Sequence, residues 1–137
     1  MNLEVRPGGS GDLDAISRIQ AGSPEASQWD VREYLKYELN VAILDSRVVG
    51  FAVSRPLAEG ENELLNLAVD PQFRRHGVGR RLVAAVISGR RGILWLEVRE
   101  SNLIASKLYE SLGFITKNTP SAIAIPRVER LTMTRPG

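Results

Sequence analysis

The chain has 137 residues, enough for one domain with a hydrophobic core, and its 43% hydrophobic and 25% charged residues are ordinary for a globular protein. It has no cysteine and one histidine, which excludes disulfides, thiolate metal sites and a cysteine nucleophile and disfavours a histidine-based triad. The net charge of +2 is small for a nucleic-acid-binding protein, and neither a membrane-spanning run nor a signal pattern occurs, so we expect one cytoplasmic domain over residues 1–137.

The first forty residues predict a strand followed by two helices. Residues 3–6 alternate between apolar and polar side chains, as a short strand does. Asp12 is placed to cap a helix that runs to about Gln20, and Asp30 is placed to cap a second helix. In that second segment, apolar and aromatic side chains recur at helical spacing at Val31, Tyr34, Leu35 and Leu39.

Three strands are predicted next, with no helix between them. Residues 41–44 and 48–53 are apolar, and Asp45-Ser46-Arg47 between them is typical of a hairpin turn. A second turn at residues 59–62 leads into an apolar strand that ends at Val69. The middle of the chain is therefore predicted to hold an antiparallel set of strands.

Residues 62–98 are predicted to form a βαβ unit. Its helix begins near Gly77 and carries its apolar side chains on one stripe, at Val78, Leu82, Val83, Val86 and Ile87. Arg90-Arg91 is interpreted as the solvated end of this helix. The strand over residues 93–98 is apolar until Glu97, which is typical of a central strand covered on both faces. Because strands joined by such a crossover are parallel, the carboxyl ends of both strands are expected to share one crevice.

The remaining elements complete the order β-α-α-β-β-β-α-β-α-β-β. A helix starts at Ser101 or Asn102 and ends at Gly113. The last strands cover residues 114–119 and about 128–133, whereas residues 121–126 carry no pattern that assigns them. The prediction is an α/β fold with one mixed sheet.

The turn inside the βαβ unit is a candidate phosphate site. Basic residues and two glycines, Gly77 and Gly79, precede the helix. The N–H groups at a helix N-terminus have no intrahelical acceptor, and together with the helix dipole they favour anions. Three arginines, Arg74, Arg75 and Arg80, add positive charge. We therefore predict that this phosphate turn, residues 70–80, binds a cofactor that carries a pyrophosphate.

Two other phosphate motifs do not fit this turn. Gly79-Arg80-Arg81 lacks the Lys-Ser/Thr pair of a P-loop, and the third glycine of a dinucleotide fingerprint is missing. The distribution of charge nevertheless favours an anionic ligand in the second half of the chain, which contains the turn. Residues 61–137 hold 12 Lys/Arg and 7 Asp/Glu, whereas residues 1–60 hold 6 and 9.

The turn resembles the acetyl-CoA loop of the GNAT N-acetyltransferase superfamily, whose pattern Arg/Gln-x-x-Gly-x-Gly/Ala is matched by Arg74, Gly77 and Gly79. The order of elements matches this superfamily over nearly the whole chain. Three stretches are similar to the bacterial ribosomal-protein-alanine N-acetyltransferases, namely residues 63–71, 94–102 and 108–114. The resemblance implies the GNAT acyl-CoA N-acyltransferase fold and acetyl-CoA as co-substrate, without a metal.

The same resemblance implies roles for individual residues. Glu97 matches the glutamate that acts as general base through a water molecule, and Tyr109 matches the general-acid tyrosine. Asn102 is expected to bond to the pantetheine arm or the acetyl group. The remaining cofactor contacts are assigned to the main chain of one strand and to the phosphate turn, at Leu67, Ala68, Val69, Arg74, Arg75, His76, Gly77, Val78, Gly79 and Arg80.

Elementary chemistry is compatible with the roles of Glu97 and Tyr109. Partial burial at the crevice is expected to raise the pKa of Glu97, and an α-amine, whose ordinary pKa is about 8, must lose a proton before it attacks a thioester. A phenol with a pKa near 10 can donate to the departing thiolate. Asn102 and Tyr109 are seven residues apart and so share a helix face. From position alone, an idle solvated carboxylate and a core aromatic are the alternatives.

The sequence does not determine which amine accepts the acetyl group. The resemblance favours the N-terminal α-amine of a protein, a ribosomal protein's alanine, and a small-molecule amine or a non-catalytic acyl-CoA-sensing domain are the alternatives. The resembled family carries an Asn-Tyr-Tyr-like aromatic segment, whereas residues 117–122 hold no aromatic, which predicts a wider or differently selective groove. The acidic turn at residues 59–63 is either a contact for a cationic acceptor or merely exposed. We expect a monomer or weak homodimer with no nucleic-acid or membrane partner.

Overall fold

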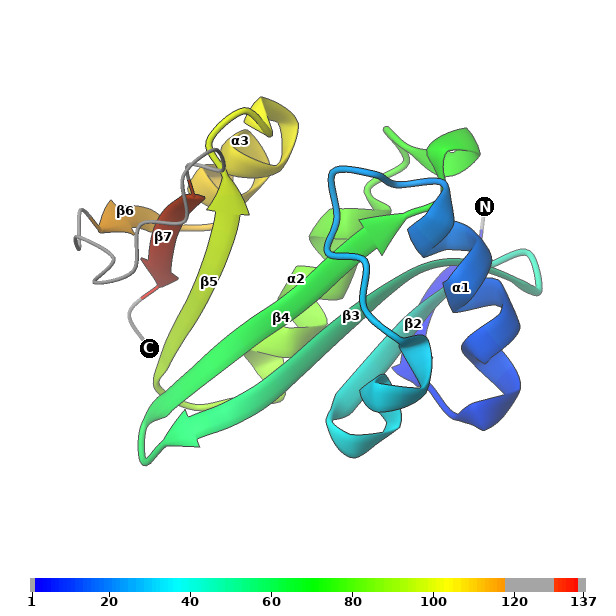
Figure 1. Cartoon of the computed structure of the whole chain (residues 1–137), viewed down its shortest axis with the longest axis horizontal. Helices are drawn as coiled ribbons and strands as arrows, with labels where there is room; N and C mark the ends of the chain where they lie inside the picture. The colour runs from blue at the N-terminus through cyan, green and yellow to red at the C-terminus, as the bar shows by residue number, and fades with distance from the viewer. Residues whose placement is uncertain (1, 118–129, 136–137) are drawn as a thin grey trace.

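The computed structural model describes residues 2–117 and 130–135, and these residues form one mixed sheet of seven strands with helices on both faces (Figure 1). The strand order is β1-β2-β3-β4-β5-β7-β6. The strands are β1 (Leu3–Pro7), β2 (Glu38–Leu44), β3 (Arg47–Ala58), β4 (Glu61–Val69), β5 (Ile93–Arg99), β6 (Ile115–Lys117) and β7 (Arg130–Arg135). The α-helices are α1 (Leu13–Ala21), α2 (Val78–Ser88) and α3 (Leu103–Ser111), and the 3-10 helices are η1 (Ser10–Asp12), η2 (Val31–Lys36) and η3 (Pro71–Phe73).

This architecture confirms the predicted α/β class, and β4 and β5 pair in parallel as the βαβ unit requires. The predicted hairpin is also present, because β2 and β3 are joined through Asp45 and Ser46, both with positive φ. Residues 118–119 and 128–129 of the two last predicted strands, and the unassigned residues 121–126, lie outside the described residues. None of the helices in the described part of the chain is long and apolar enough to cross a membrane.

The second predicted helix is wrong in type and extent. Asp30 does cap it, since its carboxylate accepts the Arg32 N–H at 3.0 Å, but the element is the short 3-10 helix η2. The chain turns extended at Tyr37, and Leu39 belongs to β2. Tyr34 and Leu39 are buried in the same core cluster, so their spacing reflected a shared core that a helix and a strand both contact. Strand pairing with β3 overrides the local helical pattern there.

Asp12 is also placed differently from the prediction, because its side chain does not cap α1. The carboxylate instead accepts the Gly9 N–H at 2.9 Å within the preceding turn and forms a bidentate pair with Arg6. The hydrogen bonds from Arg6 hold the pKa of Asp12 below its ordinary value. Asp12 therefore ties the end of β1 to the start of α1.

Two apolar clusters lie on opposite faces of the sheet. On one face, α2 buries the predicted stripe, with Leu82 and Val83 fully buried. On the other face, Ile16 and Ile19 of α1 pack with Tyr34 and Phe51, whose rings are 5.6 Å apart. In Figure 1, α1 lies in front of the strands β2 to β4 and α2 lies behind them. Helices thus cover both faces of the sheet over β2, β3 and β4.

The expectation that β5 is covered on both faces is wrong. Leu94, Leu96 and Val98 are buried in the cluster below α2, but the alternate side chains Glu97 and Arg99 are exposed. The strand is central in the sheet, between β4 and β7. Its polar face is open because α1 packs over β3 and β4 instead.

Arg90 was expected to be solvated, and the structure places it in the interior. Its side chain is only 8% exposed, and it reaches three strands: it forms an ion pair with Glu38 at 3.0 Å and donates to Ser54 Oγ and Asn62 Oδ1, each at 3.1 Å. Neighbouring Arg91 is exposed. An arginine can bury its apolar stem and bring several donors to one place, which periodicity at a helix end does not reveal.

We expect Arg90→Ala to lower the free energy of unfolding by about 2–3 kcal/mol, because Ser54 and Asn62 lose a buried partner and a cavity forms. Arg91→Ala, one residue away but exposed, is the matched control and should change it by less than about 0.5 kcal/mol. Urea unfolding of the two variants checks this. Equal, small effects would show that the Arg90 contacts add nothing to stability.

Candidate active site

β4 and β5 diverge beyond their paired segment (Figure 1), and a groove lies at this point. The two strands pair only from Glu61↔Ile93 to Leu64↔Leu96, although β4 continues to Val69. The groove has a volume of about 1080 Å³ and is lined by both strand ends, the phosphate turn, the start of α3 and residues 25–27. The predicted convergence of the two strand ends on one crevice is therefore confirmed.

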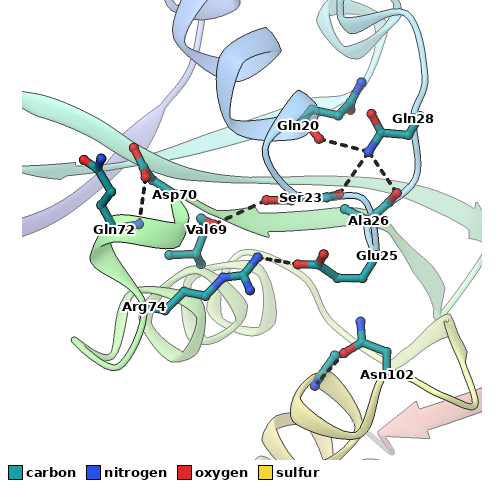
Figure 2. A network of polar contacts seen from close by, with 11 residues as sticks. Gln20, Ser23, Glu25, Ala26, Gln28, Val69, Asp70, Gln72, Arg74 and Asn102 are labelled. Atoms are coloured by element: carbon teal, nitrogen blue, oxygen red, sulfur yellow. Dashed lines mark hydrogen bonds and ion pairs between the residues drawn. The ribbon is translucent and has the colours of Figure 1, made fainter.

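The divergence exposes a backbone edge of β4 toward the groove. The Asp70 N–H bonds to the Val49 carbonyl of β3 at 2.8 Å. The N–H and C=O groups of successive residues point to opposite sides of a strand. Those of Val69 and Leu67 therefore point away from β3, into the space between the diverging strands β4 and β5. The Ser23 hydroxyl, which donates to the Val69 carbonyl at 3.5 Å, approaches from that side (Figure 2). This edge can pair with the amides of an extended ligand.

A β-bulge in β4 lies at the point of divergence. The register passes from Val53↔Asn66 to Ser54↔Leu64, which leaves Leu65 as an extra residue. A bulge bends a strand and turns the following side chains. Sequence reasoning missed it, and the one polar residue in the apolar run, Asn66, was the available signal.

The phosphate turn has the expected geometry. Asp70 caps η3 by accepting the Gln72 N–H at 3.0 Å, and Gly77 has a φ of +76°, a conformation that favours glycine. The first helical bond of α2 runs from the Arg81 N–H to the Gly77 carbonyl, so the three preceding N–H groups have no intrahelical acceptor. At Gly79 a Cβ would lie 3.2 Å from Leu108 of α3. The glycine therefore lets the first turn of α2 approach α3 closely.

The basic residues of the turn differ in placement. Arg74, Arg75 and Arg80 line the groove, and Arg80 donates to Ser111 Oγ at 2.8 Å. His76 is exposed but is not a groove-lining residue, and its ring lies 6.5 Å from that of Phe73. The structure therefore brings the arginines, but not the histidine, to the groove.

Arg74 forms an ion pair with Glu25, which lies in the loop between α1 and η2. Figure 2 shows the two side chains pointing toward one another, from the phosphate turn and from this loop. Both residues line the groove, so the pair joins two of its lining segments. No local sequence pattern in this loop points to a functional role.

Glu97 and Tyr109 both line the groove, but in different environments. Glu97 is exposed, so its expected partial burial is wrong. Tyr109 is 6% exposed, and its ring packs against Phe114 with centroids 5.5 Å apart. Burial raises the pKa of the Tyr109 phenol well above its ordinary value, so the hydroxyl keeps its proton across the neutral range.

Asn102 lies two helical turns from Tyr109 on the groove side of α3. Its Oδ1 accepts the Ala105 N–H at 3.2 Å, which caps the helix. Its Nδ2 makes no hydrogen bond within the part of the chain that the structure describes and can donate to a ligand. Across residues 2–117 and 130–135 no group of three or more acidic or histidine side chains could hold a metal ion.

Residues 13–114 match the family described as the Acetyltransferase (GNAT) family. The chain belongs to this family. A solved relative, the ribosomal-protein-S18-alanine N-acetyltransferase from Escherichia coli, superposes with a TM-score of 0.80 at 28% identity, over 98% of this chain and 94% of that one. The GNAT fold of this chain is thereby established.

Two further relatives of this GNAT chain are informative. A ribosomal protein bS18-alanine N-acetyltransferase from Haemophilus ducreyi is 49% identical over 71 residues, which are 49% of this chain and 48% of that protein. The chain thus spans about half the length of the curated relatives it matches. A GNAT family acetyltransferase from Elizabethkingia anophelis, solved with acetyl-CoA bound, shares the fold with a TM-score of 0.75 at 23% identity, over 99% of each chain.

Proposed function

We propose that this GNAT chain transfers the acetyl group of acetyl-CoA directly to a primary amine, with the N-terminal α-amine of a ribosomal protein's alanine as the favoured acceptor. The observation that carries the proposal is the divergence of β4 from β5, because it brings a phosphate-binding turn, an open backbone edge, a carboxylate and a phenol to one groove. The relatives named above support the acceptor.

In this proposal the pyrophosphate lies on the first N–H groups of α2, at Val78, Gly79 and Arg80, with the three groove-lining arginines nearby. The pantetheine amides pair with the main chain of the strand edge from Leu67 to Val69, and the Asn102 amide donates from the opposite side.

The chemical steps follow from the remaining two side chains. Glu97 is exposed, so a water can carry the proton from the ammonium group to its carboxylate. The neutral amine then attacks the thioester carbonyl, and a main-chain N–H of β4 stabilises the oxyanion. The nitrogen then loses its second proton to water, the C–S bond breaks, and the Tyr109 hydroxyl donates a hydrogen bond to the departing thiolate. No covalent intermediate on the protein and no metal are needed.

The acidic turn keeps part of its charge for a cationic acceptor, because Glu59 is exposed and only Glu63 forms an ion pair. Glu63 pairs with Arg55 at 2.9 Å, and Glu61 accepts the Trp95 indole N–H at 3.1 Å. The segment without aromatics lies, beyond Lys117, outside the described residues. A small amine therefore stays the second candidate acceptor, and a non-catalytic acyl-CoA sensor the third candidate function.

A thiol-release assay with acetyl-CoA tests the proposal. The panel consists of peptides that begin with Ala, Ser, Met or Gly and of free polyamines, and mass spectrometry locates the acetyl group. Preferred release with the Ala peptide, acetylated at its α-amine, is expected. Acetylation of polyamines alone would replace the acceptor, and tight binding of acetyl-CoA without any release would favour a sensor.

Glu25 should compete with the pyrophosphate for Arg74. We expect Glu25→Gln to tighten CoA binding by about two- to fivefold, the range that an exposed ion pair worth up to about 1 kcal/mol allows. Calorimetry measures this, and Arg74→Ala provides the matched background, in which the Glu25 substitution should have no effect. Weaker binding in the Glu25→Gln variant would mean that Glu25 helps to hold the cofactor.

A further inference from the structure

Asn66 is a buried polar residue inside the apolar strand β4. It is 6% exposed and follows the extra residue of the bulge, where β4 leaves β5. Buried polar side chains are retained when their hydrogen bonds are made. Both ends of the Asn66 amide are engaged, and they contact two different walls of the groove.

The amide nitrogen of Asn66 faces the loop over residues 22–30. Nδ2 donates to the Ser27 carbonyl at 3.0 Å and to the Tyr34 hydroxyl at 2.9 Å. The loop has a second brace, because Gln28 Nε2 donates to the carbonyls of residues 23 and 26 within the loop and of residue 20 in α1 (Figure 2). Asn66 therefore holds the braced loop, whose residues 25–27 line the groove, against the sheet.

The amide oxygen of Asn66 faces the backbone edge. Oδ1 accepts the Leu67 N–H at 3.0 Å, one of the groups that point toward the groove. An amide is planar, so the two sets of bonds cannot change direction independently. The Asn66 amide therefore links the loop directly to the Leu67 N–H.

We propose that Asn66 is a positioning residue that aligns the loop over residues 22–30 with the Leu67 N–H, and thereby aligns the amine with the thioester. Through this hydrogen bond, Oδ1 fixes the direction in which the Leu67 N–H meets the thioester. The catalytic consequence rests on the proposed function, whereas the coupling of loop and strand edge does not.

Amide hydrogen exchange tests the coupling without turnover. In Asn66→Ala, exchange should accelerate by tenfold or more both in residues 22–30 and at Leu67. Asn66→Asp keeps the acceptor and loses the donor, so it should accelerate exchange in the loop alone. Gln28→Ala is the matched control, since it loosens the loop from within and should leave Leu67 unchanged. Acceleration at only one of the two places in Asn66→Ala, or at Leu67 in Gln28→Ala, would overturn the proposal.

Steady-state kinetics test the catalytic half. For Asn66→Ala we expect kcat to fall about tenfold and the acceptor KM to rise about tenfold, while the Kd of acetyl-CoA changes less than threefold. Tyr34→Phe removes a hydroxyl from the same network and should keep kcat within twofold. Equal kinetics for both variants would overturn the positioning role. If the unaltered protein releases no CoA with any amine, the proposed function fails, and the exchange experiment still decides the coupling.

Discussion

Replacing Glu97 by glutamine should lower kcat/KM for amine acetylation by about 10²–10⁴-fold at pH 7, the range that loss of a general base produces. An α-amine has an ordinary pKa of about 8 and is mostly protonated at this pH, so removal of the ammonium proton precedes attack. Glu97 lies on the groove wall and is open to solvent, which allows a bridging water. Glutamine keeps the shape and removes the basic oxygen.

The pH dependence of the Glu97→Gln deficit is the decisive measurement. Above about pH 9 the free amine predominates, so the deficit should shrink. Glu110→Gln, on the exposed side of α3 and away from the groove, is the matched control and should leave the rate unchanged. A deficit below twofold at pH 7 would remove Glu97 from the mechanism.

Replacing Tyr109 by phenylalanine should lower kcat by about 10- to 100-fold with little change in the Kd of acetyl-CoA. Phenylalanine preserves the packing against Phe114 and removes only the donor. Burial raises the pKa of the Tyr109 phenol above its ordinary value, and a thiol has an ordinary pKa of about 8.5. The phenol is therefore a weaker acid than the thiol, and complete transfer of its proton to the thiolate is unfavourable. Tyr109 therefore acts mainly as a hydrogen-bond donor to the thiolate.

The raised pKa also fixes the expected pH profile. The protonated phenol is the active form, and a pKa above the ordinary value of about 10 keeps it protonated at lower pH. Activity of the unaltered protein should therefore rise with pH as the amine loses its proton. At any pH lower than about 10, ionisation of Tyr109 should cause no loss of activity. Tyr37→Phe, outside the groove, is the control. A falling limb below pH 9 that Tyr109→Phe abolishes would contradict the raised pKa.

The spacing of apolar residues predicted the structure best where a single helix buries one stripe of apolar side chains. The apolar spacing of α2 and the glycines before it predicted a helix with an open N-terminus, and the structure has both. The same kind of reasoning misplaced the segment after Asp30, where Tyr34 and Leu39 share a core but not a helix. The spacing of apolar residues indicates which side chains are buried together. It does not indicate whether the backbone that carries them forms a helix or pairs with a neighbouring strand.

The chain by itself determined the α/β class and the glycine-containing turn before α2, because each depends on residue types at short spacing, whereas the roles of Glu97, Asn102 and Tyr109 came from the family resemblance. Only the tertiary structure decided that Glu97 is exposed, that Arg90 is buried against three strands, and that the loop over residues 22–30 forms a wall of the groove. These features depend on how far β4 and β5 diverge and on what packs across the sheet. Such contacts join residues far apart in the chain, and no local pattern records them.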